Sequence, residues 1–257
     1  MIGLDFPVKP EWIHAALNLW QPGQPVEDLV EAALIQAMPD VEGEKSRRNS
    51  LSIILRLFVP TEGNNRGRKT TDSNAWAAHS KTLPPTTLAP AYLTGLISDS
   101  EVAREAAAFI ARRHAPGDRL TSSELRQVLV NRYGERTVVI NSVSAFLRSL
   151  QYFRVLQSGD RLGEYFYQRR LTIEREIFPL LVWTWWKRQP TPQIDLEAFE
   201  QSPIFSFLET DGFERCWSAY QPGLWVLSER LGSKTSTIKA SDDEAFSTLL
   251  TRYLLKN

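Results

Sequence analysis

Four hydrogen-bonding side chains recur at helical spacing near the middle of the chain. The predicted helix spans about residues 135–153, and its polar stripe consists of Thr137, Asn141, Ser144 and Arg148. An apolar stripe on roughly the opposite face consists of Val139, Val143, Phe146 and Leu150. In the major groove of DNA, asparagine can pair with adenine and arginine with guanine. In a helix-turn-helix the start of the second helix enters the groove, which would place Arg136, Thr137 and Asn141 nearest the bases. The alternative is the polar face of an ordinary surface helix.

Two neighbouring segments supply further candidates for DNA contacts. Arg161 lies at the tip of a predicted hairpin loop, from which it could reach a minor groove whose negative potential favours arginine. Arg169 and Arg170 follow on the predicted return strand. Ser122 and Ser123 open the preceding short helix, where backbone N–H groups can hold a phosphate.

The elements around these residues follow the order of a winged helix. Ser98 and Glu101 form a capping box, Thr121 or Ser122 caps the next helix, and Gly134 stands where a helix-terminating glycine belongs. The predicted elements are helices over 98–114, 123–133 and 135–153 and strands over 153–157 and 164–173. Two helices, a third helix and a hairpin predict a winged-helix domain over residues 98–173.

Charge is distributed unevenly along a chain whose net charge is zero. Residues 102–173 contain 12 arginines, no lysine and 6 acidic residues, a net charge of +6. Residues 1–101 and 174–257 each carry a net charge of −3. A basic centre between acidic flanks fits one nucleic-acid surface on a larger scaffold, and arginine is the better ligand for phosphates and base edges. Double-stranded DNA is therefore the expected partner.

The flanking regions are predicted to be helical and to be separated from the centre by a linker. Residues 1–59 form an N-terminal helical region, and residues 60–97 read as a flexible basic loop or linker. Arg66, Arg68 and Lys69 in this loop are a possible flexible arm for phosphates, although a solvated loop is the simpler interpretation. Residues 174–257 form a C-terminal helical region with a small strand-containing unit, and one interpretation of this unit is a second, smaller winged unit. The expected fold class is mainly α with small β-hairpins (α+β).

The sequence offers little that indicates catalysis, a metal or a membrane. Glycine-rich phosphate loops and the common hydrolase and metalloprotease motifs are missing, so a non-enzymatic protein without cofactor or small-molecule substrate is expected. His14, His79, His114 and the lone Cys216 lack metal-ligand spacing. The apolar runs are too short to span a bilayer, and the single cysteine favours a reducing compartment, the cytoplasm.

Two other functions remain open at this stage. A subunit of a larger assembly would use the tryptophan-rich segment over 174–189 as an apolar docking surface, although Trp183, Trp185 and Trp186 fit a core helix better. A transcriptional regulator would share the DNA chemistry but would usually add a dimerisation helix or a ligand pocket, and neither is identifiable.

The order of elements resembles that of the BrxA family of bacterial BREX anti-phage systems. The resemblance is carried by Tyr133–Thr137, which leads into a helix and a hairpin, and most specifically by Gly134–Val138 through Phe153–Leu156. It implies a small, non-enzymatic DNA-binding component of a phage-defence system with several protein partners.

Overall fold

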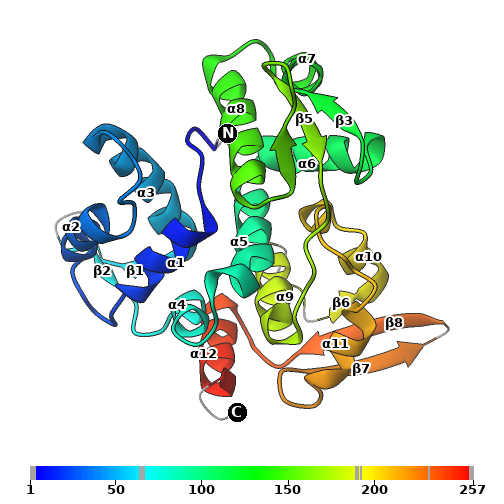
Figure 1. Ribbon diagram of the computed structural model, residues 1–257. Helices are drawn as coiled ribbons and strands as arrows, with labels where there is room; N and C mark the ends of the chain where they lie inside the picture. Colours follow the sequence, from blue (N-terminus) through cyan, green and yellow to red (C-terminus); the bar gives the residue numbers. More distant parts are fainter. Residues whose placement is uncertain (1–3, 64–66, 189–190, 192, 231, 255–257) are drawn as a thin grey trace.

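The chain folds into a mixed α+β structure that is mainly helical with small antiparallel sheets, as the sequence predicts at this level (Figure 1). The computed structural model describes residues 4–63, 67–188, 191, 193–230 and 232–254. The N-terminal elements are α1 (Pro10–Asn18), α2 (Val26–Gln36), α3 (Glu44–Phe58), β1 (Thr61–Glu62), β2 (Lys69–Thr70), α4 (Ala75–Ser80) and α5 (Pro85–Asp99). Buried hydrophobic side chains of the described residues form one cluster that runs from Leu4 to Leu250.

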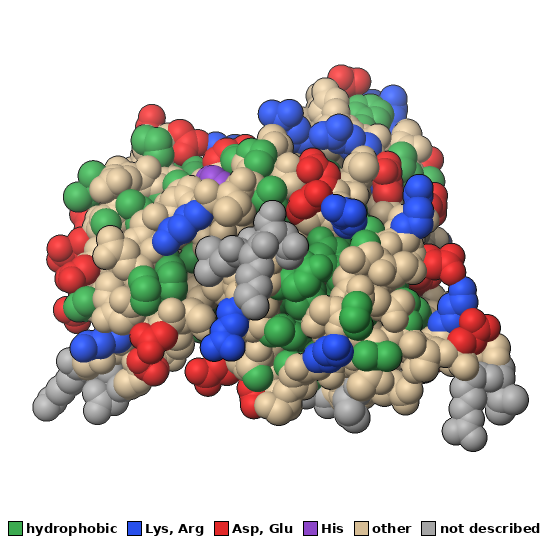
Figure 2. All heavy atoms as spheres, turned by 90° about the horizontal axis from the view of Figure 1, so that it is seen from below, with side chains coloured by type: hydrophobic (Ala, Val, Ile, Leu, Met, Phe, Trp, Pro, Cys, Tyr) green, Lys and Arg blue, Asp and Glu red, His purple; other side chains and the backbone are tan. Residues whose placement is uncertain are grey.

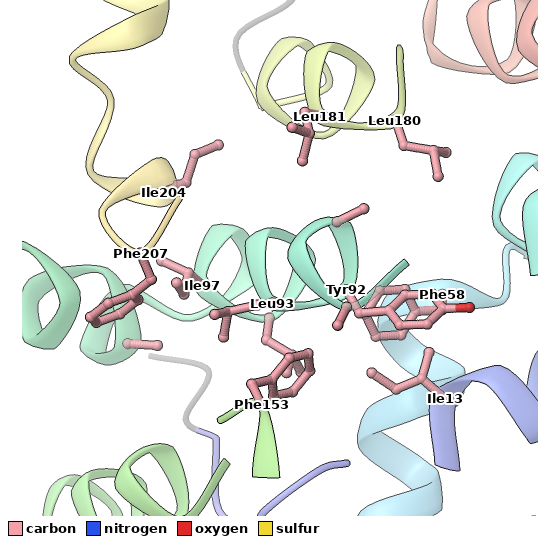
Figure 3. Close-up of a cluster of buried hydrophobic side chains, with 14 of the residues drawn as sticks. Ile13, Phe58, Tyr92, Leu93, Ile97, Phe153, Leu180, Leu181, Ile204 and Phe207 are labelled. Carbon is pink, nitrogen blue, oxygen red and sulfur yellow. The ribbon is translucent and has the colours of Figure 1, made fainter. Parts of the chain in front are cut away.

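The segment predicted to be a flexible linker contains the central helix of the molecule, so that prediction is wrong. Helix α5 has 15 residues, of which 12 are buried. Figure 3 shows side chains from α1, α3, α9 and the segments around Phe153 and Phe207 gathered about α5. Because α5 is buried on all sides, its sequence has no amphipathic period, and Pro85 marks the start of the helix. A Cβ at Gly95 would lie 2.8 Å from Cε1 of Phe58, so only glycine allows this close approach.

The next elements build a small three-stranded sheet with helices packed beside it. They are α6 (Glu101–Arg113), β3 (Arg119–Thr121), α7 (Ser122–Tyr133), α8 (Thr137–Tyr152), β4 (Leu156–Ser158) and β5 (Glu164–Tyr167). The strand order is β3-β5-β4, and both pairings are antiparallel. Strand β3 has no counterpart in the sequence-based prediction. It exists because Arg119, Leu120 and Thr121 pair with Phe166, Tyr165 and Glu164.

The helix boundaries in this region differ most from the prediction at the start of α6. Ser98 does not cap a helix, because it lies inside α5 and is buried. Ser100 is the cap of α6, and its side chain accepts a hydrogen bond from the N–H of Ala103. The predicted caps Thr121 and Gly134 are confirmed at the two ends of α7.

The C-terminal third contains a second small sheet. Its elements are η1 (Arg175–Ile177), α9 (Phe178–Trp186), β6 (Gln193–Asp195), α10 (Leu196–Glu200), η2 (Pro203–Phe205), α11 (Phe213–Ala219), β7 (Trp225–Arg230), β8 (Ser233–Ile238) and α12 (Asp243–Leu254). An aromatic cluster fills this part of the core. The rings of Phe199 and Phe205 are 4.6 Å apart, and those of Trp217 and Trp225 are 4.8 Å apart.

The two sheets are built with the same connectivity. In residues 119–167, which we name the first unit, a strand is followed by two helices and a hairpin, and the first strand pairs with the last. In residues 193–238, the second unit, the same order gives the sheet β6-β8-β7, with the short η2 inserted between its helices. A helix precedes each unit, α6 in one case and α9 in the other. None of the helices in the described part of the chain combines the length and apolar character needed to cross a bilayer.

Candidate nucleic-acid interface

Helix α8 presents the polar stripe of the prediction to solvent and buries the apolar stripe. Arg136 occupies the N-cap position, and α8 runs from Thr137 to Tyr152. The exposed residues of the stripe are Arg136, Thr137, Asn141, Ser144 and Arg148. The residues of the predicted apolar stripe, all at most 1% exposed, are Val139, Val143, Phe146 and Leu150. Burial of one face therefore fixes which face of α8 points outward.

The side chains at the start of the polar stripe make fewer hydrogen bonds within the described chain than those at its end. Among the described residues, the side chains of Arg136, Thr137 and Asn141 make no hydrogen bond or ion pair within the chain. Arg148 donates from Nε to the Tyr152 hydroxyl at 3.2 Å, and this hydrogen bond holds the pKa of the guanidinium above its ordinary value. Ser144 donates its hydroxyl to the Ile140 carbonyl at 3.3 Å. Three unengaged donors and acceptors thus gather at the N-terminal end of α8.

The N-terminal segment covers one flank of α8, a contact that the sequence does not predict. The N–H of Val8 donates to Ser149 Oγ at 3.0 Å, and the hydroxyl of Ser142 donates to Asp5 Oδ1 at 3.5 Å. Ser142 and Ser149 are seven residues apart, so both lie on one side of the helix, and both are buried. The exposed arc of α8 is therefore narrow and is bordered by the Asp5 carboxylate.

The loop between β4 and β5 is held against the start of α7. The N–H of Ser122 donates to the Gly163 carbonyl at 2.8 Å, and Gly163 has a φ of +82°. This bond corrects the expectation that Ser122 offers a free backbone N–H to a phosphate. Ser123 is exposed, and its hydroxyl lies 3.1 Å from the hydroxyl of Thr121. Arg161 is exposed at the loop tip, beside a fully exposed Leu162.

Arg169 and Arg170 do not lie on the return strand. Strand β5 ends at Tyr167, and the chain then leaves the sheet towards Leu171, which forms an isolated bridge with Leu208. Both arginines are exposed, but β5 separates them from the loop tip that carries Arg161. Arg169 instead lines a surface hollow with Arg154 and Glu174. The structure thus brings Arg161 and the start of α7 together but places Arg169 and Arg170 elsewhere.

The proposed basic arm is anchored where it is described. Arg66 lies outside the described residues. Arg68 donates from Nε to Thr61 Oγ1 at 2.7 Å, and Lys69 belongs to β2, opposite Glu62 of β1. The Arg68 carbonyl also accepts a hydrogen bond from the N–H of Val26 at 3.0 Å, which ties the ribbon to α2. In Figure 1 this ribbon lies among the N-terminal helices, on the other side of the molecule from α7 and β3.

The alternative docking surface does not exist as predicted. The helix of this segment is α9, over Phe178–Trp186, and all nine residues are buried, including the three tryptophans. The interpretation of these tryptophans as core is confirmed. In the described part of the chain, no group of three or more histidine, cysteine, aspartate or glutamate side chains is placed to hold a metal ion.

The underside of the molecule carries mixed charge. Figure 2 shows basic and acidic side chains interspersed on this face, with hydrophobic side chains gathered near its centre. The two units differ in charge. The first unit contains 7 arginines and 4 acidic residues, whereas the second unit contains 3 basic and 7 acidic residues. Net positive charge therefore belongs to the unit that contains α8.

Comparison with known proteins identifies neighbours in fold only. Two solved structures of SspB, one of them described as magnesium-ion-bound, match at TM-scores of 0.60 and 0.59 and 15% sequence identity. Each match covers 97% of this chain and 86% of the other chain, so the likeness extends over nearly the entire fold. No family model matches the sequence, and no curated protein matches it. The resemblance to the BrxA family thus stays a prediction.

Proposed function

We propose that this chain binds double-stranded DNA, without catalysing a reaction on it, by inserting the start of α8 into the major groove. Helix α6 and the first unit have the connectivity of a winged helix: helix, strand, two helices and a hairpin. In this proposal α8 is the recognition helix and the β4–β5 loop is the wing. The resemblance to BrxA would add protein partners in a phage-defence system.

The observation that carries the proposal is the unengaged start of α8. The side chains of Arg136, Thr137 and Asn141 are exposed and make no hydrogen bond within the described chain, while the opposite face of the helix is anchored in the core. A helix whose inner face is buried and whose outer side chains have no hydrogen-bond partner is suited to base contacts, because little ordering of its backbone is needed on binding.

Phosphate contacts would come from the flanks of the same surface. Arg161 at the tip of the loop and the N–H groups at the start of α7 near Ser123 can contact the backbone of the duplex. The carboxylate of Asp5 beside α8 limits how closely phosphates approach that flank, since like charges repel. The footprint is therefore expected on the side of α8 that faces the β4–β5 loop.

The experiment is a salt titration of DNA binding. Fluorescence anisotropy of a labelled random duplex of about 30 base pairs is measured with the full chain across a range of salt concentrations. Each neutralised phosphate contributes about −0.9 to the slope of log affinity against log salt. A slope of several units supports the proposal. An absence of binding at low salt would overturn it.

A further inference from the structure

A cavity lies at the end of the molecule opposite α7, between four segments that are distant in sequence. It encloses about 320 Å³ and is lined by residues of α4, η1, the start of α9, the end of α11 and α12. Figure 2 views this end of the molecule. Its size lies at the lower end of the range for small-ligand sites, which is about 300–1,000 Å³. Neither the DNA surface nor the core of the second unit accounts for it.

His79 reaches this cavity from α4 with one ring nitrogen uncommitted. The side chain is 1% exposed, and its Nδ1 lies 2.7 Å from the Ala75 carbonyl. A carbonyl can only accept, so Nδ1 carries the proton and Nε2 is an acceptor. Among the described residues nothing donates to Nε2. Burial lowers the pKa of His79 to about 4, so the ring stays neutral near pH 7 and Nε2 can accept a hydrogen bond from a ligand.

The walls of the cavity suit a flat ring. The rings of Tyr220 and Tyr253 lie 5.6 Å apart at an angle of 56°. Pro179, Leu224 and Leu250 complete an apolar lining. Aromatic side chains favour stacked or edge-on contact with another ring. A planar heterocycle that carries an N–H group would satisfy both these walls and His79.

The rim of the cavity carries one cation and one anion. Arg175 and Glu176 are both exposed there, and neither takes part in an ion pair within the described chain. The guanidinium of Arg175 can hold an anionic group, because its planar fork matches carboxylate and phosphate oxygens. The neighbouring carboxylate of Glu176 disfavours a ligand with a chain of two or three phosphates, whose negative charge is larger than that of one phosphate.

We propose that this cavity binds a planar N–H-bearing heterocycle with a single anionic group, the chemistry of a purine mononucleotide. The ring stacks on the tyrosines and donates to His79 Nε2, while the anionic group meets Arg175 at the rim. This site is independent of the DNA-binding proposal, so failure of one leaves the other standing.

Isothermal titration calorimetry of the full chain with AMP and GMP tests the proposal, with adenosine and inorganic phosphate as partial ligands. At least one nucleotide should bind below about 1 mM and at least about tenfold more tightly than either partial ligand. Failure of both nucleotides to bind at that concentration would overturn the proposal. Phosphate binding as tightly as the nucleotides would also overturn it, since a surface anion site would then explain the data.

Variants on the rim locate the ligand without disturbing the core. Arg175→Ala should weaken nucleotide binding about tenfold or more and leave adenosine binding unchanged, because the exposed side chain touches only the anionic group. Ala219→Trp, at an exposed position of the lining, should block both by filling the cavity. Arg215→Ala is the matched control for Arg175→Ala, because it also removes an exposed arginine but lies on α11 outside the cavity lining. Unchanged nucleotide binding in Ala219→Trp would show that the ligand sits elsewhere.

A nitrogen NMR experiment measures directly whether Nε2 of His79 accepts a hydrogen bond. The protein has only three histidines, and the Nε2 resonance of His79 should start at the value of an unprotonated acceptor. It should shift when the nucleotide donates a hydrogen bond to it. A nucleotide that binds without moving this resonance would contradict the proposed pose.

Discussion

The first and second units share one connectivity but differ in the length of the second helix, in its exposed side chains and in net charge. In the first unit the second helix, α8, has 16 residues and an exposed stripe with two arginines. In the second unit the equivalent helix, α11, has seven residues, and its first-turn Glu214 is paired with Lys234 at 2.5 Å. The net charge is +3 in the first unit and −4 in the second.

Under the proposed function, this difference means that connectivity alone does not make a DNA-binding surface. The second unit buries large aromatic side chains, among them Phe199, Trp217 and Trp225, and so contributes to the core. In the first unit, one face of the long helix α8 is exposed and carries polar side chains that have no hydrogen-bond partner in the described chain. One copy of the arrangement thus carries the surface proposed to bind DNA, while the other adds to the core and lines part of the cavity that Tyr220 borders.

The largest effect is expected in the core of the second unit. Trp217 is fully buried and packs against Phe199 and Trp225 at centroid distances of 5.1 and 4.8 Å. Trp217→Ala should lower the free energy of unfolding by about 3–5 kcal/mol, because it leaves a large cavity. Urea denaturation measures this, with the exposed neighbour variant Ser218→Ala as control. A loss below about 1 kcal/mol would show that the second unit is not part of the core.

The next effect concerns DNA binding by the first unit. Arg136→Ala and Asn141→Ala should each weaken binding by about 1–3 kcal/mol, because each removes a base-edge contact. Thermal melting should be unchanged, since both side chains are exposed. Arg215→Ala, an exposed arginine of α11 in the second unit, is the matched control in anisotropy measurements. Equal losses of DNA affinity in Arg215→Ala and Arg136→Ala would show that the two units do not differ in DNA binding.

A smaller effect is expected at the tip of the β4–β5 loop. Arg161→Ala should weaken DNA binding only a few-fold and reduce the salt slope by about 1, as expected for one lost phosphate contact. Leu162→Ala changes the same exposed tip without changing charge and should leave the slope unaltered. If both variants behave alike, the loop acts through its shape and the phosphate contact is wrong.

The smallest effect should come from the surface ion pair of the second unit. Both side chains of the Lys234–Glu214 pair are more than half exposed, so Glu214→Gln should leave the stability nearly unchanged. DNA affinity should not change, because this surface faces away from the proposed duplex. A marked rise in affinity on removal of this carboxylate would place the second unit near DNA.

The local features of the first unit could be predicted from the sequence because they depend on neighbours in the chain. The stripes of α8 repeat at helical spacing, and the ends of α7 are marked by Thr121 and Gly134. Features that depend on distant partners could not be predicted. Strand β3 has three residues and is defined only by its pairing with β5, more than 40 residues later.

Two further errors have the same origin. The sequence of α5 resembles a linker, because a helix buried on every side has no polar face and no amphipathic period. The packing of residues 5–8 along α8 joins segments about 140 residues apart, so the local sequence around Ser142 and Ser149 does not indicate this contact. The N–H of Ser122 bonds to Gly163, which lies about 40 residues later in the chain, so the sequence around Ser122 does not indicate this bond.

Site-specific cross-linking tests most directly whether α8 of the first unit, and not α11 of the second, contacts DNA. Because the native Cys216 is buried, a photoactivatable group can be attached at Ser144→Cys or, for comparison, at Ser218→Cys, in a Cys216→Ala background. Irradiation with a labelled duplex should give a covalent protein–DNA product from position 144 and none from position 218. A product from position 218 alone, or from neither position under conditions where the duplex is bound, would contradict the account.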